Sequence, residues 1–291
     1  MKAQEGDEIV RRDTNRGRFY PLTLPDGTGV NYPSVTTLLG AISKKALVNW
    51  AARTERELVA DASTQLYLDV AGTPKMTEIA YRASLETRIG KVRAFKREME
   101  AAADIGTAVH KRIEWGLRKE LGQKVGREPR LCEKGEWAYM AYSDWQNSVE
   151  LKPLFLERRV YSVTHEYAGT LDMFGIINGV PTVVDFKTSK GIYGEALIQV
   201  AALIVALRES GQGDAKAGLV LRLPKVDTDP EFEVVDIAAR SAEWYGIERA
   251  AAEGYLFDLF LAAKRIWWSQ YHADQAYWDA RKKCEGASDA A

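Results

Sequence analysis

The spacing of hydrophobic and polar positions divides the chain into a helical first part and a strand-rich centre. Residues 1–40 are predicted to form a short β-rich segment that turns at Pro25-Asp26-Gly27. From Ser43 to Leu121, apolar residues recur at helical spacing. A polar connector follows at 122–135, and residues 137–149 are predicted to form another helix.

Short apolar runs bounded by turn residues dominate the centre of the chain. They predict strands at residues 154–162, 169–177, 180–187, 217–223 and 231–236. A buried helix is predicted at 194–209, and the aromatic-rich tail at 238–283 is predicted to be helical and to fray at its small-residue end. This order of elements predicts an α/β fold, with a mixed sheet between helical layers.

Two of the predicted strands form a hairpin that brings two aspartates together. Asn178-Gly179 lies between apolar runs, and both residues tolerate the positive φ of a type I′ turn. A two-residue loop sets Ile177 opposite Val180, and the same register places Asp172 opposite Asp185. Opposed side chains lie about 4.5–5.5 Å apart at Cβ, and opposed like charges destabilise a sheet.

Lys187 lies two residues after Asp185 and therefore projects from the same face. A surface hairpin can carry such charges as an ordinary solvated cluster. Here, however, both faces of the strands are otherwise apolar, and buried charges are costly unless they are paired or bind a metal. The pattern favours a cation site with hydrolytic chemistry. Pro181 cannot donate to the sheet and could shift the register by one residue.

Composition limits the classes of function. The chain has 291 residues, is 46% hydrophobic and has a net charge of −1, so a nucleic-acid site would have to rest on local basic patches. Its two cysteines, Cys132 and Cys284, are far apart, which argues against an iron–sulfur cluster and favours a reducing compartment. The chain start lacks the apolar region of a signal peptide, and no membrane span is evident. We expect a cytoplasmic protein that does not associate with a membrane.

Three further residues could belong to the cation site on the hairpin. His110 lies inside a predicted helix, where a lone histidine is more often structural than a ligand. From Ala196 to Leu207, Gln199 is the only polar residue of an otherwise apolar helix, and its buried amide needs a partner, either a backbone group or the site. Glu157 could contribute an extra carboxylate, although its alternation with Arg159 and Tyr161 fits an exposed strand face equally well. The basic residues at 88–97 are by default a solvated helix face.

Together these features resemble a known family. Asp172 followed by Asp185-Phe186-Lys187 on a hairpin resembles the signature of the PD-(D/E)XK nucleases, with Thr-Leu-Asp in place of the loosely kept "PD". Gly106-Thr107-Ala108-Val109-His110 and Gln199 are similar to further motifs of the RecB-like branch. Three segments of the chain are especially similar to phage-encoded exonucleases of this branch and to the mitochondrial genome maintenance exonucleases. They are Tyr32-Pro33-Ser34-Val35-Thr36, Tyr167-Ala168-Gly169-Thr170-Leu171-Asp172 and Val184-Asp185-Phe186-Lys187-Thr188-Ser189. The likeness covers about residues 30 to 260.

The resemblance implies a single nuclease domain over residues 1–291, with a restriction-endonuclease-like core whose mixed central sheet is flanked by helices. Its parts would be a β-rich segment at 1–43, a helical arch-like segment at 44–100, a catalytic core at 101–237 and C-terminal helices at 238–283. One departure is Leu203, where the RecB-like branch usually has a tyrosine four residues after the glutamine. The low cysteine count also separates the chain from the members with an iron–sulfur cluster.

The resemblance implies an exonuclease that hydrolyses DNA with Mg²⁺ or Mn²⁺ and acts on free single-stranded ends. It further implies a role in recombination, repair or replication, with partner proteins from these processes. A phage-encoded protein would fit this resemblance. Metal ligands would be His110, Asp172, Asp185 and the backbone carbonyl of Phe186, with Lys187 as the catalytic cation. Substrate contacts would come from Gln199, Ser189, Lys190, Arg88, Lys91 and Lys96. The alternatives are a structure-specific endonuclease on the same fold and a catalytically silent DNA-binding or assembly module.

Overall fold

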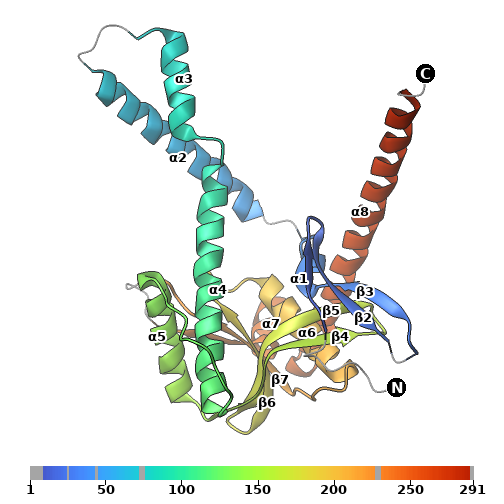
Figure 1. Cartoon of the computed structure of the whole chain (residues 1–291). Coiled ribbons are helices and arrows are strands. Elements are labelled where there is room, and N and C mark those ends of the chain that lie inside the picture. Colours follow the sequence, from blue (N-terminus) through green and yellow to red (C-terminus); the bar gives the residue numbers. More distant parts are fainter. Residues whose placement is uncertain (1–8, 25, 43–44, 72–75, 227–230, 289–291) are drawn as a thin grey trace. The chain divides into compact units, whose positions relative to one another are not determined.

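A computed structural model describes residues 9–24, 26–42, 45–71, 76–226 and 231–288, and it divides the chain into two compact units (Figure 1). The larger unit comprises Met1–Ile42 with Ala108–Ala291, and the smaller one comprises Ser43–Thr107. Helix α4 (Ala94–Glu120) begins in the smaller unit and ends in the larger one. The predicted arch-like segment at 44–100 lies within the smaller unit.

The chain begins with a small antiparallel sheet. Its strands are β1 (Arg12–Thr14), β2 (Gly17–Thr23) and β3 (Gly29–Pro33), followed by the short helix α1 (Val35–Leu39). The predicted turn is present at Asp26, whose carboxylate accepts a hydrogen bond from the Thr28 N–H, while Pro25 lies outside the described residues. Tyr20 and Thr170 share a hydrogen bond of 2.8 Å between their hydroxyls, which ties this sheet to the central one.

The central sheet has five strands in the spatial order β4-β5-β6-β7-β8. They are β4 (Leu151–Ser162), β5 (Tyr167–Ile177), β6 (Val180–Lys187), β7 (Ala217–Arg222) and β8 (Glu233–Asp236). Only the β6–β7 pairing is parallel, because α6 (Gly194–Glu209) provides the crossover between these strands. The mixed sheet predicted from the element order is therefore confirmed.

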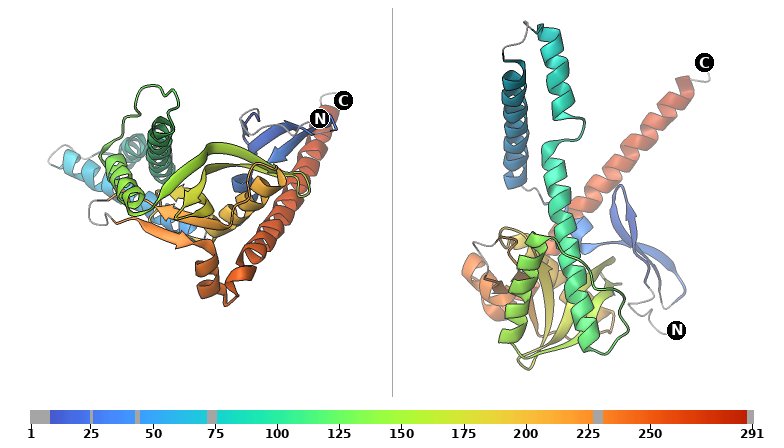
Figure 2. Two further views of the ribbon diagram at one scale, coloured as in Figure 1. Left: turned by 90° about the horizontal axis from the view of Figure 1, so that it is seen from below. Right: turned by 60° about the vertical axis from the view of Figure 1, so that its left-hand side comes forward.

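Helices cover both faces of this sheet (Figure 2). Helix α6 packs on one face, and its buried residues join the main hydrophobic core. On the other face the ring of Phe186 contacts His110 of α4 and Tyr142 of α5 (Glu133–Ser148). The catalytic residues predicted on β5 and β6 thus lie between two helical layers.

The hairpin register is the one that Asn178-Gly179 predicts. Asn178 and Gly179 have φ values of 48° and 83°, and Ile177 pairs with Val180. Pro181 pairs with Ile176 without shifting the register. The irregularity lies instead in β4, between Pro153 and Phe155.

The helices match their predicted positions to different degrees. Helix α6 has the predicted bounds, whereas α5 starts at Glu133, inside the stretch predicted to be a connector. The C-terminal helices predicted at 238–283 are present, and Gly246, with a left-handed φ of 66°, ends the first of them, α7 (Ile237–Tyr245). A 3₁₀ turn (Arg249–Ala251) and the long helix α8 (Ala252–Ser288) follow, and residues 289–291 of the end that was expected to fray lie outside the described residues.

The smaller unit consists of helices α2 (Lys45–Val70) and α3 (Glu78–Ile89) with the first part of α4. Within it, Ser63 and Tyr81 share a hydrogen bond of 2.9 Å, and Trp50 packs edge-on against Phe95. Most of its side chains are exposed, so the unit has little core of its own. Among the helices of the described residues, none combines the length and hydropathy needed to cross a bilayer.

Gly169 allows β5 and α6 to pack closely. A Cβ at this position would lie 2.5 Å from Leu203 Cδ2 and 3.3 Å from Val35 Cγ2. Leu203 is 1% exposed and packs in the core. At this position the side chain therefore contributes to packing, not to a solvent-facing contact.

We expect Gly169→Ala to lower the free energy of unfolding by about 1–3 kcal/mol, because the new methyl overpacks the core. Gly254→Ala in α8 is the control, since no atom lies within 4 Å of its added Cβ, and a small gain is expected there. Urea unfolding would measure both. A Gly169→Ala stability equal to that of the wild type would contradict the tight contact with Leu203.

Candidate active site

Three potential metal ligands from three elements meet at the centre of the sheet. His110 comes from α4, Glu157 from β4 and Asp172 from β5, and one ligand atom of each lies within 4.8 Å of the others. His110 Nδ1 is 3.5 Å from Asp172 Oδ1. This group could hold a metal ion, since it combines two carboxylates with an imidazole in a partly buried place.

Glu157 reaches this group through an unusual backbone conformation. Its φ is 49°, in the left-handed region that residues other than glycine rarely adopt. The neighbouring pairs Leu156–Met173 and Arg158–Leu171 keep one register, so Glu157 stands opposite Asp172, although these two residues are not paired. Such a conformation costs on the order of 1–3 kcal/mol and is concentrated at functional sites. The alternation of the strand gave no sign of this.

Asp185 belongs to a second group of side chains, on the side of α6. Its Oδ2 lies 2.6 Å from Lys187 Nζ, and its Oδ1 accepts a hydrogen bond of 2.7 Å from Gln199 Nε2. Lys187 Nζ also donates to Gln199 Oε1 at 3.1 Å. The three side chains thus form a closed ring of polar contacts. The Asp185 side chain is only 3% exposed, whereas that of Lys187 is 28% exposed.

The two groups are joined where the regular hairpin pairing ends. The last pair of the β5–β6 ladder is Met173–Val184, one position before the aspartates. Beyond it, the backbone N–H of Phe186 donates a hydrogen bond of 2.8 Å to Asp172 Oδ2. A side chain therefore takes the place of a backbone acceptor. Phe186 makes this contact through its backbone N–H. That its backbone carbonyl binds a metal ion remains a prediction.

Burial and mutual repulsion raise the pKa values of two carboxyls. Burial, then the charges of Asp172 and Glu114, raise the pKa of Glu157 to about 7. Burial likewise raises the pKa of Asp185 to about 6, where the Asp172 charge adds to the rise and Lys187 opposes it. The metal-free site thus holds more negative charge than the protein environment alone can stabilise.

Asp172 remains ionised in the same surroundings. Burial favours its neutral form, but the His110 charge and hydrogen bond, with Lys187 and the Phe186 N–H, outweigh burial and lower its pKa. Burial also opposes the charge on His110 and on Lys187, yet the nearby aspartates raise both pKa values. Lys187 is therefore a fixed ammonium and not a proton acceptor.

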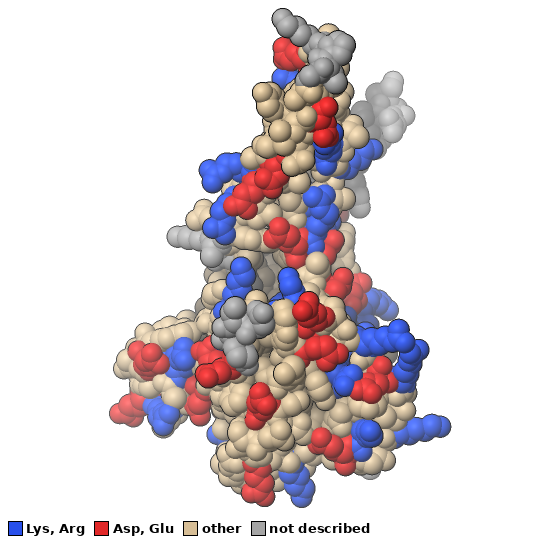
Figure 3. Space-filling model, turned by 90° about the vertical axis from the view of Figure 1, so that its left-hand side faces the viewer, with Lys and Arg blue, Asp and Glu red and all other residues tan. Residues whose placement is uncertain are grey.

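The remaining predicted substrate residues are not part of this cluster. Ser189 donates its hydroxyl hydrogen bond to the Gly191 carbonyl at 2.7 Å, in the loop after β6, where Lys190 is exposed. In the smaller unit, Arg88 is paired with Asp69 at 2.5 Å and Lys96 lies 3.8 Å from Glu100. Lys91 is exposed there. Figure 3 shows basic and acidic side chains interspersed on the displayed face.

Sequence reasoning missed Glu114. It lies one helical turn after His110 on α4, and its Oε1 accepts a hydrogen bond of 2.7 Å from Arg118 Nε. Its charge contributes to the raised pKa of Glu157. The i, i+4 spacing from His110 could have revealed a shared helix face, but only after His110 had been assigned to the site.

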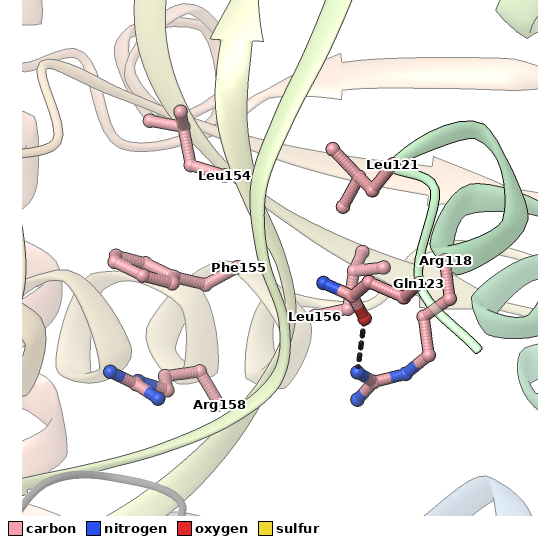
Figure 4. A pocket seen from close by; sticks show the side chains of 7 residues that line it. All are labelled: Arg118, Leu121, Gln123, Leu154, Phe155, Leu156 and Arg158. Atoms are coloured by element: carbon pink, nitrogen blue, oxygen red, sulfur yellow. Dashed lines mark hydrogen bonds between the residues drawn. The ribbon is translucent and has the colours of Figure 1, made fainter. Parts of the chain in front are cut away.

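A pocket lies beside the same stretch of β4 (Figure 4). Its two arginines are already bound: Arg118 contacts Glu114 and Gln123, and Arg158 donates to Gln212 at 2.6 Å. These contacts hold the end of α4 and the residue next to Glu157 in place. The pocket is thus best understood as part of the support of the site.

No family model matches the chain, and neither does any curated protein. The arrangement of the side chains is therefore the ground for a functional interpretation. It combines a cluster suited to a cation with an adjacent buried ammonium.

The raised pKa values predict how the metal-free protein responds to pH. Folded Glu157 holds its proton up to about pH 7, against an ordinary value of 4.5, so stability is lost as pH rises through this interval. The free energy of unfolding should fall by an amount on the order of 2 kcal/mol. This is less than the full pKa shift would give, because Glu157 is partly exposed and solvent screens its charge. Glu157→Gln should reduce this loss of stability, and millimolar Mn²⁺ should raise the melting temperature of the wild type at pH 8.

Thermal unfolding between pH 4.5 and 8, with EDTA and with Mn²⁺, would measure these effects. Glu98→Gln, which changes an exposed carboxylate in the smaller unit, is the control and should leave both responses unchanged. If Mn²⁺ failed to stabilise the wild type, or stabilised Glu157→Gln equally well, Glu157 would have no part in a metal site.

Proposed function

We propose that this protein is a metal-dependent deoxyribonuclease that hydrolyses phosphodiester bonds at the free ends of single-stranded DNA. The observation that carries the proposal is the cluster of His110, Glu157 and Asp172 together with the ammonium of Lys187. The charge of Lys187 acts on both His110 and Asp172, and Asp185 and Gln199 hold this ammonium in place. The resemblance to RecB-like exonucleases supports the substrate class, and roles in recombination, repair or replication follow from it.

The donor set fits a hard divalent cation. Carboxylate oxygens and an imidazole suit Mg²⁺ or Mn²⁺, and the imidazole favours Mn²⁺. Burial and then the negative charges of Asp172 and Glu114 raise the pKa of Glu157, and a bound cation would neutralise this negative charge. We propose His110, Glu157 and Asp172 as ligands, with Asp185 and the Phe186 carbonyl as further ones. When bound, the cation would supply polarisation of the scissile phosphoryl oxygen and a lower pKa for a coordinated water.

Lys187 is the catalytic residue that the protein itself supplies. Its side chain is 28% exposed, so the ammonium can face a phosphate while Asp185 and Gln199 restrict its motion. A compact positive charge stabilises the charge that develops on phosphoryl oxygens in the transition state. Gln199 acts as a positioning residue, because its amide contacts both Lys187 and Asp185.

The intact Asp185–Lys187 pair argues against a silent binding module, because an isolated buried pair gains little stability over apolar residues. A hydrolase that uses one carboxylate as acid and another as base would not need the fixed ammonium. A structure-specific endonuclease would use the same groups, and the form of the substrate distinguishes it.

Lys187→Gln should lower the turnover of linear single-stranded DNA by about a hundredfold to a thousandfold, since it removes a charge that acts in the transition state. Metal affinity, measured from the Mn²⁺-dependent rise in melting temperature, should stay close to that of the wild type. The control Lys152→Gln removes an exposed ammonium of β4 that is not among the expected substrate contacts, and it should keep most activity. Near-normal cleavage by Lys187→Gln would assign its role to another group.

The substrate form provides the second test. Linear single-stranded DNA with Mn²⁺ should be degraded to short products, EDTA should abolish the reaction, and covalently closed single-stranded circles should be spared. Replacing Arg88, Lys91 and Lys96 together with glutamine should weaken binding for all sequences and reduce its salt dependence. Efficient cutting of closed circles would instead indicate an endonuclease.

A further inference from the structure

The aromatic-rich end of α8 has no part in the site described above. Four of its aromatic side chains, here called the aromatic ladder, recur at intervals that share one side of a helix: Trp267, Trp268, Tyr271 and His272. At the inner end Trp267 packs against the hydrophobic core, and at the outer end His272 is exposed. The ladder therefore leaves the core and continues outward along the helix.

The rings of the ladder are held in parallel pairs. Trp267 and Tyr271 stack at 4.9 Å with an interplanar angle of 21°, and Trp268 and His272 stack at 5.3 Å with the same angle. Phe19 of β2 contacts Trp267 with ring centroids 6.1 Å apart. Because neighbouring rings already restrict these side chains, a planar ligand could stack on them at a low cost in conformational entropy.

An arginine-rich hairpin lies beside α8, the helix that carries the ladder (Figures 1 and 2). Residues 11–18, which form the β1–β2 hairpin, include four arginines and one aspartate. Asp13 pairs with Arg11 at 2.8 Å and with Arg18 at 3.1 Å, while Arg12 and Arg16 are exposed. The guanidinium of Arg16 lies 5.3 Å from the centre of the Tyr271 ring. Positive charge is thus in direct contact with the ladder, in a chain of net charge −1.

We propose that the aromatic ladder and the arginine hairpin form a binding surface for single-stranded DNA, separate from the active site. Unpaired bases would stack on the rings, while phosphates would approach Arg12 and Arg16. A duplex cannot offer its base faces, and an acidic peptide would match the arginines but not the ring stack. The proposal depends on the proposed function only for DNA as the kind of nucleic acid.

The experiment measures binding in EDTA, where cleavage is not expected, with the full chain and a fluorescein-labelled single-stranded oligonucleotide. Trp268→Ala should weaken binding by roughly fivefold to a hundredfold, and Trp268→Phe, which keeps a ring, should restore most of the affinity. Arg16→Gln should weaken binding and lower the slope of log affinity against log salt by about 0.7. The matching duplex should bind less tightly than the single strand.

The matched controls are Trp244→Ala and Arg240→Gln on α7. Trp244 is 40% exposed and also has an arginine over its ring, Arg240 at 5.1 Å, but it lies outside the ladder. Both controls should bind as the wild type does. The proposal is overturned if Trp268→Ala and Arg16→Gln also bind with wild-type affinity and salt slope, or if the wild type binds only a second copy of itself in sedimentation experiments.

Cleavage with Mn²⁺ is a separate measurement. Loss of binding in the ladder variants, in a protein that cleaves no DNA, would support the surface and reject the proposed nuclease. Normal binding by the ladder variants in a protein that depends on Lys187 for cleavage would reject the surface and leave the nuclease in place.

Discussion

The burial of three carboxylates around one point of the central sheet is the constraint on which the rest of the site depends. Asp172 and Asp185 lie on neighbouring strands joined by a two-residue turn, and Glu157 approaches from the strand on the other side. Asp185 is buried, and Asp172 and Glu157 are only partly exposed. The surrounding residues therefore serve to stabilise negative charge, and the raised pKa values of Glu157 and Asp185 show that they do so incompletely.

The protein divides this task between its two helical layers. From α4, His110 approaches Asp172 and lowers its pKa, so this aspartate stays ionised. From α6, Gln199 completes a ring with Lys187 and Asp185, so the ammonium stays charged although it is largely buried. One aspartate is thus prepared for a ligand, and the other is engaged with the lysine. Two opposed aspartates that look equivalent in sequence have different electrostatic surroundings.

The hairpin shows how far sequence reasoning extends. The turn residues determine the register, so the pairing from Ile177–Val180 to Met173–Val184 could be predicted. The predicted pairing of Asp172 with Asp185 does not form, because the ladder ends one position earlier and the two side chains have different partners. The bounds of α6 followed from its continuous apolar run and the flanking strands. Glu157 was ambiguous, because its orientation depends on a left-handed backbone conformation that no local pattern indicates for a glutamate. Glu114 was missed, because helix packing, not spacing along the chain, brings it near Glu157.

Regular backbone pairing of β5 and β6 ends one position before the aspartates, and this break explains why the two layers meet there. If the ladder continued, the Phe186 N–H would need a backbone acceptor, and Asp172 would project to one face only. Instead the Phe186 N–H binds the Asp172 carboxylate, which lies 3.5 Å from His110 of α4, while the charge of Lys187 on β6 helps to lower its pKa. The strained Glu157 is tolerated at the same level on the adjacent strand. Loss of regular pairing at this single level therefore leaves each helical layer in contact with its own carboxylate, α4 with Asp172 through His110 and α6 with Asp185 through Gln199.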